Sequence, residues 1–178
     1  DGFLERFPCD AMFGMHNAPG KPAGRFVVVP GFAMSSSDTA IITVTGQGGH
    51  GAMPHVAVDP VVAASSIVMA LQTIVARNVP PLQMGIVTVG AFHAGDAPNV
   101  IPDSAELRLT VRAFHPAVRD LLERRIHEIA QHQAAVYGAT ARVEYQRRYP
   151  VLNNHAAETA FCDRVIRDWL GDDGVLAN

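Results

Sequence analysis

The chain has 178 residues, a formal net charge of −3 and 48% hydrophobic residues, so it has ample material for a buried core. No basic stripe stands out, and no nucleic-acid partner is expected. No apolar run approaches the roughly 20 residues that cross a bilayer, so no membrane partner is expected either. Cys9 and Cys162 form no CxxC pair and no disulfide framework, which makes a cytoplasmic location the default.

The two ends of the chain resemble pieces of another domain. Residues 1–34 are rich in glycine and proline, and the apolar run at residues 11–15 predicts a buried strand among loops. Asp1 is not an initiator methionine, and the chain stops soon after a helix-like stretch that contains Trp169. We therefore expect both ends to be cuts through a larger protein.

The first half of the central region predicts a strand, a helix and a second strand. Residues 39–45 alternate and are rich in Thr, Ile and Val, as in a strand. Asp59 and Pro60 are a strong helix start, because Asp caps free amides and Pro suits the first turn. Apolar residues then recur at helical spacing until about Asn78. Residues 84–92 are apolar and β-branched, which predicts a strand, and a loop is expected over residues 95–102.

The second half repeats this pattern. From Ser104, apolar and polar residues alternate as in a half-buried strand. Pro116 opens a second helix with one apolar stripe, and Gly138 is a good C-terminal stop. Residues 141–146 alternate again and predict the last strand.

The order strand, helix, strand, strand, helix, strand predicts an α+β domain of ferredoxin-like topology over residues 36–150. Its sheet would be antiparallel, in strand order 4-1-3-2, with both helices on one face. Residues 84–92 would then form an edge that has no Lys, Arg, Asp or Glu to discourage pairing. We expect two copies of this edge to pair and to form a homodimer.

His50 is the first candidate site residue, within the run Gly48-Gly49-His50-Gly51. The glycines let the backbone approach a ligand closely. Imidazole can donate a hydrogen bond to a developing oxyanion or stabilise its charge. A glycine-rich turn with an incidental histidine explains the local pattern equally well.

His16, Asn99 and Arg112 are further candidates. His16 follows a short apolar run, a common setting for a metal ligand. Asn99 can donate to a carbonyl, and the planar fork of Arg112 fits a carboxylate. Taken singly, an ordinary loop histidine, a turn asparagine and a solvated strand arginine explain these positions better.

Taken in order, these segments resemble a family of metal-dependent amidohydrolases. The family includes hippurate hydrolases, N-acyl-amino-acid amidohydrolases and indole-acetyl-amino-acid hydrolases, within the carboxypeptidase G and aminoacylase superfamily. The matching segments are residues 13–20, 36–38, 46–55, 59–64 and 97–102. The run Gly-Gly-His-Gly-Ala-Met-Pro-His is the most specific, and Ala18 departs from the pattern, because a Trp is frequent there.

The resemblance implies a catalytic domain, here residues 1–35 and 151–178, interrupted by a lid or dimerisation domain over residues 36–150. It implies two divalent metal ions (Zn, Mn, Co or Ni), with His16 matching one ligand. The other ligands and a Glu general base would lie outside this chain. His50 matches a lid histidine that reaches the partner's active site, and Asn99 and Arg112 resemble the residues that hold the substrate carboxylate.

The activity implied is metal-assisted hydrolysis of the amide bond of N-acyl amino acids such as hippurate. This chain would be an incomplete part of that hydrolase, expected to be inactive alone and to hold no metal by itself. Two alternatives stay open. The central region could be a non-catalytic ferredoxin-like binding or dimerisation module. The parent protein could also be a dipeptidase or a deacetylase of the same superfamily.

Overall fold

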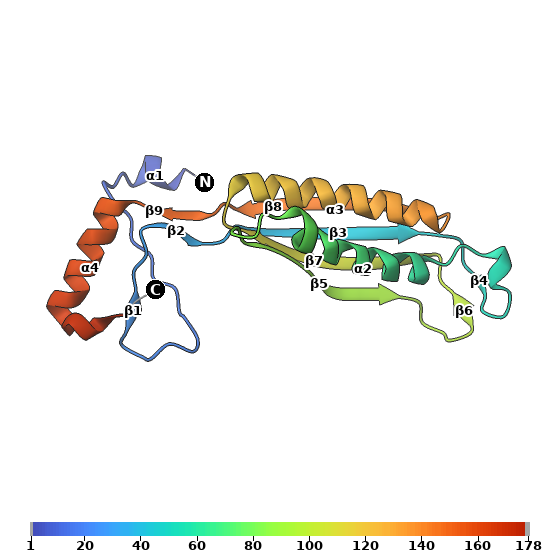
Figure 1. The fold of residues 1–178 in the computed structure, drawn as a ribbon, viewed down its shortest axis with the longest axis horizontal. Helices are drawn as coiled ribbons and strands as arrows, with labels where there is room; N and C mark the ends of the chain where they lie inside the picture. Colours follow the sequence, from blue (N-terminus) through green and yellow to red (C-terminus); the bar gives the residue numbers. More distant parts are fainter. Residues whose placement is uncertain (1, 177–178) are drawn as a thin grey trace. The chain divides into compact units, whose positions relative to one another are not determined.

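The computed structural model describes residues 2–176, which form two compact units. Met34–Leu152 make one unit, and the two flanking segments make the other (Figure 1). The assignment of the flanking segments to a catalytic domain stays a prediction.

The unit Met34–Leu152 has the predicted ferredoxin-like topology. Its main elements are β3 (Ser37–Thr45), α2 (Pro60–Asn78), β5 (Gly85–Ala94), β7 (Ser104–Ala113), α3 (Pro116–Val136) and β8 (Thr140–Tyr149). The strands pair in the order β5-β7-β3-β8, and every pairing is antiparallel. The α+β class and the strand order 4-1-3-2 are therefore confirmed.

One face of the sheet is buried under both helices. Ile42 on β3 pairs with Leu107 on β7 and with Val143 on β8, so alternate residues of the strands point the same way. Ile67 of α2 and Leu122 of α3 belong to the same fully buried core. Burying such a side chain contributes about 1.5–3 kcal/mol, which is why the register of this face is well specified.

Helix α2 begins as predicted, because Asp59 Oδ1 accepts hydrogen bonds from the amides of Val61 (2.8 Å) and Val62 (3.3 Å). The expectation that no apolar run approaches a membrane-spanning length is wrong for this helix. It has 19 residues and contains an 18-residue stretch with a mean hydropathy of 1.5, so by length and composition it is apolar enough to cross a membrane. Its apolar character has a structural use here, since Ile67 and Leu71 are fully buried in the core.

Two short strands interrupt regions that sequence analysis treated as loops. β4 (Gly49–His50) and β6 (Val100–Ile101) pair with each other in antiparallel fashion. Figure 1 draws them together beyond one end of the four-stranded sheet. Strands of two residues have no alternation to detect, so their pairing depends on the tertiary structure.

The flanking unit contains α1 (Phe3–Arg6), β1 (Phe26–Val27), α4 (Ala156–Leu170) and β10 (Val175–Leu176), and β1 pairs in parallel with β10. A further pair, β2 (Gly31–Met34) and β9 (Leu152–Asn154), lies where the two units join in sequence. The predicted buried strand at residues 11–15 is wrong. Met12 is 64% exposed and Met15 83% exposed, because the described residues place no sheet beside them.

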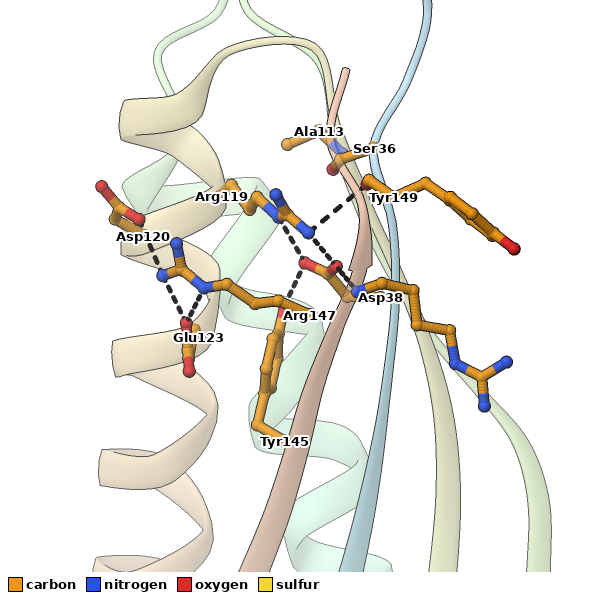
Figure 2. A network of polar contacts seen from close by, with 10 residues as sticks. Ser36, Asp38, Ala113, Arg119, Asp120, Glu123, Tyr145, Arg147 and Tyr149 are labelled. Carbon is orange, nitrogen blue, oxygen red and sulfur yellow. Dashed lines mark hydrogen bonds and ion pairs between the residues drawn. The ribbon is translucent and has the colours of Figure 1, made fainter. Parts of the chain in front are cut away.

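A buried carboxylate organises the end of the sheet where β3 starts and β8 stops (Figure 2). Asp38 is fully buried and accepts from Arg119 Nε at 2.8 Å and Nη2 at 2.5 Å. The hydroxyl of Tyr145 and the amide of Arg148 also donate to it, at 3.0 and 3.1 Å. Arg119 thereby links α3 to β3 and, through the shared carboxylate of Asp38, to β8.

Candidate functional site

His50 lies on a tip loop beyond the end of β3. β4 pairs His50 with Val100, and Gly49 with Ile101. The short helix η1 (Pro54–Val56) follows, and α2 starts a few residues later. His50 is exposed, so the fold presents its ring to solvent at the tip of the unit Met34–Leu152.

Close backbone contacts explain the glycines around His50. A Cβ atom at Gly46 would lie 2.1 Å from the carbonyl oxygen of Val58, and one at Gly48 would lie 2.7 Å from that of Ile101. At Gly51 it would lie 3.0 Å from the carbonyl oxygen of Asn99. Side chains at these positions would push the loop away from its neighbours, so the glycines serve the packing of the loop.

The ring of His50 has a defined tautomer when neutral. The backbone amide of Ala52 donates to Nδ1 at 3.1 Å. An amide can only donate, so Nδ1 accepts and the ring proton lies on Nε2. Nε2–H is then the donor of this tautomer, which is the form needed to hold a carbonyl oxygen or an oxyanion.

Asn99 lies beside His50. Its carbonyl oxygen accepts from the amide of Gly51 at 2.8 Å, and the next residue, Val100, pairs with His50. The structure therefore brings two of the predicted site residues together, although 48 positions separate them in the chain.

Arg112 lies at the opposite end of the sheet. It is half-buried on β7, on the face away from the helices, opposite Ile86 of β5. Ser104 begins β7 at the tip end, and Arg112 is eight residues further along, so about 26 Å separates them at about 3.3 Å per residue. One copy of this unit therefore does not bring Arg112 to His50 and Asn99.

His16 belongs to the flanking unit and is exposed. Its Nδ1 lies 2.6 Å from the carbonyl oxygen of Asn17. A carbonyl can only accept, so Nδ1 carries the proton and Nε2 keeps a lone pair, as in many metal-binding histidines. Residues 2–176 contain no group of three or more His, Cys, Asp or Glu placed to hold a metal ion. His16 suits a ligand, but the described chain does not assemble a metal site around it.

Asp103 is a residue of the tip that sequence analysis missed. Its Oδ1 accepts from the amide of Gly48 at 2.8 Å, and its backbone oxygen accepts from Gly46 at 2.9 Å. An Asp directly after Pro102 and before a strand is a typical loop acceptor, and this signal was present in the sequence.

The fold and its tip define a class of protein. It is an α+β domain of ferredoxin-like topology, flanked in sequence by segments of a second unit. One edge strand of its sheet has no Lys, Arg, Asp or Glu, and its tip loop carries a histidine. Residues 33–138 match the M20 peptidase dimerisation domain family. The chain belongs to this family, and the predicted relationship to metal-dependent amidohydrolases is confirmed.

Named relatives include the hippurate hydrolase of Campylobacter jejuni, which is 38% identical over 97% of this chain and 45% of its own length. The N-acetyl-L-cysteine deacetylase of Bacillus subtilis is 38% identical over 89% of this chain and 38% of its own length. Among solved structures, a dinuclear metal-binding peptidase of the M20 family from Bacillus subtilis aligns with a TM-score of 0.67 and 29% identity, over 92% of this chain and 39% of that one. The chain thus spans less than half the length of these proteins.

Proposed function

We propose that this chain is the lid and part of the catalytic domain of a cytoplasmic, metal-dependent amidohydrolase that cleaves the amide bond of N-acyl amino acids. The observation that carries the proposal is the hydrogen bond from the Ala52 amide to His50 Nδ1, which leaves Nε2 as the second ring nitrogen of an exposed histidine at the tip of the dimerisation domain. Relatives named as a hippurate hydrolase and a deacetylase both act on such amides, so they support the substrate class without choosing the acyl group.

His50 Nε2–H would donate to the acyl carbonyl as it becomes a tetrahedral oxyanion, with Asn99 beside it. Arg112, through its planar guanidinium, and Asn99 would hold the carboxylate of the amino acid. His16 Nε2 would provide one ligand of a divalent-metal site, whose chemistry is to lower the pKa of a bound water. The remaining ligands and the general base would come from outside this chain.

The separation of Arg112 from the tip has a consequence for the dimer. Only a few bonds join the acyl carbonyl of an N-acyl amino acid to its carboxylate, whereas about 26 Å of strand separates the two ends of β7. A single lid cannot reach both groups of one substrate. We therefore assign Arg112 of one copy, and His50 and Asn99 of the second copy, to each active site.

Hybrid dimers of the full-length protein test this assignment. His50→Ala and Arg112→Ala chains carry different affinity tags and are co-expressed, and the mixed dimers are purified through both tags. In each parent homodimer, both active sites lack the same substrate contact, either that of His50 or that of Arg112. In the hybrid, one site has lost both contacts and the other is intact, so about half of the wild-type turnover per dimer should return.

A hybrid of two differently tagged His50→Ala chains is the matched control and should stay inactive. If the mixed hybrid is as inactive as its parents, one lid serves one site and the two-copy assignment is wrong. Failure of the full-length wild type to hydrolyse hippurate or N-acetyl amino acids with any divalent metal would reject the hydrolase itself. The chain would then be better explained as a dimerisation module without catalysis.

A further inference from the structure

We propose that Asp103 is a positioning residue for His50, holding the tip loop so that the ring presents Nε2–H in one direction. This inference rests on the role proposed for His50. Asp103 does not touch the substrate in this proposal, and it acts through the backbone of Gly48.

Asp103 fastens the start of the loop in two places. Its carboxylate accepts from the Gly48 amide at 2.8 Å, and its backbone oxygen accepts from the Gly46 amide at 2.9 Å. The missing side chain at Gly48 makes this approach possible, since a Cβ there would lie 2.9 Å from Asp103 Oδ1. Gly48 is two residues before His50, so the carboxylate restrains the backbone that leads into the histidine.

Backbone groups hold the rest of the loop. Gln47 exchanges two hydrogen bonds with Val58, at 2.8 and 2.9 Å, and the Gly51 amide donates to the carbonyl of Asn99 at 2.8 Å. Substitution leaves such bonds in place, whereas the carboxylate of Asp103 can be removed without changing the backbone. Asp103 is therefore the position at which the anchoring of His50 can be tested.

The decisive readout is amide hydrogen exchange by NMR in the 178-residue chain. Asp103→Ala should speed exchange about fivefold at Gly48, which loses its acceptor, and at Ala52, whose acceptor is His50 Nδ1. Asp103→Asn keeps an oxygen at the same place and should leave both amides protected. Core amides such as those of Ile42 and Leu107 should be unchanged in both variants.

Asp96→Ala removes another exposed aspartate, from the connection between β5 and β6, and is the matched control. This substitution should change the amide exchange rate of neither Gly48 nor Ala52. Unchanged exchange at Ala52 in Asp103→Ala would overturn the proposal, because Asp103 would then hold Gly48 without orienting His50. This readout needs no enzymatic activity, so it stands apart from the test of the proposed function.

In the full-length hydrolase, Asp103→Ala should lower kcat on the order of tenfold, with KM and metal content within about twofold of wild type. Asp103→Asn should restore kcat. A merely structural role would lower the melting temperature and the active fraction of Asp103→Ala but would leave kcat per active site unchanged. An unchanged kcat in Asp103→Ala would also overturn the proposal.

Discussion

The rings of His16 and His50 make opposite contacts through Nδ1. His16 Nδ1 faces a carbonyl oxygen and leaves Nε2 free to bind a metal, whereas His50 Nδ1 faces an amide and leaves Nε2 as a donor. This difference supports the two different roles that we propose for His16 and His50.

In the full-length protein, His16→Ala should therefore strip metal, whereas His50→Ala should keep it and lower kcat about 10²–10³-fold, the usual effect of removing one oxyanion donor. Metal content by mass spectrometry and kcat on hippurate measure the two effects. His132→Ala is the control, since His132 is an exposed α3 histidine whose Nδ1 lies 2.8 Å from the carbonyl oxygen of Glu128. Equal loss of metal in the His16 and His50 variants would contradict the division of roles.

At the scale of elements, Asp38 ties α3 to β3 and β8. Burial raises the pKa of its carboxyl, but the hydrogen bonds from Arg119, Tyr145 and the Arg148 amide outweigh burial and lower the pKa below its ordinary value. The ionised carboxylate thus stabilises the fold above the unfolded pKa of about 3.9, and this contribution is lost as the pH falls through the lower folded value.

Asp38→Asn leaves Arg119 without its charge partner and should reduce the free energy of unfolding at pH 7 by about 3–5 kcal/mol. The difference from wild type should narrow as the pH falls below about 4. Urea unfolding of the 178-residue chain between pH 7 and pH 3 measures both effects. Glu144→Gln, which breaks an exposed ion pair with Arg142, should cost less than about 1 kcal/mol. A pH-independent loss in Asp38→Asn would contradict this account.

The edge strand β5 is the element that we expect to form the dimer. It has no Lys, Arg, Asp or Glu, whereas the other edge, β8, carries Arg142, Glu144, Arg147 and Arg148. A bulge between Val89 and Ala91 interrupts the register of β5, which leaves residues 85–89 as the regular edge.

Thr88→Lys should weaken this pairing, because it adds a charge to an edge that would be covered by a second copy. Sedimentation of the 178-residue chain at about tens of micromolar should shift from dimer toward monomer. Thr110→Lys adds the same charge one strand inward, opposite Thr88, and should keep the dimer. Val87→Pro is a poorer test, since Val87 is 7% exposed and its loss would also damage the core. A monomeric wild type would contradict edge pairing.

At the scale of the whole molecule, the 178-residue chain should not hydrolyse N-acyl amino acids. A catalytic metal site needs about three protein ligands, and the described residues group no three candidates. A metal-supplemented assay on hippurate should give no turnover above buffer, whereas the full-length protein should be active. Metal-dependent turnover by this chain alone would show that the site is assembled differently.

Much of the fold was predictable from local chemistry. The alternation from Ser104 specified β7, and Asp59 with Pro60 specified the start of α2, because period and capping are properties of neighbouring residues. The family resemblance rested on ordered motifs, which are also local. The short strands β4 and β6 were missed, because pairing of two residues leaves no periodic pattern.

The sequence by itself determined the topology, the edge strand, the family and the candidate residues. Only the tertiary structure decided which candidates meet. It placed Asn99 beside His50, because the amide of Gly51 donates to the carbonyl oxygen of Asn99 and Val100 pairs with His50. It also separated Arg112 from both residues by the length of β7. It also assigned the ring protons of His16 and His50 and revealed Asp103 as an anchor. Distances across a fold depend on residues far apart in the chain. The ring contacts are made with neighbouring residues, but they depend on the backbone conformation of each loop, which the order of residue types does not specify.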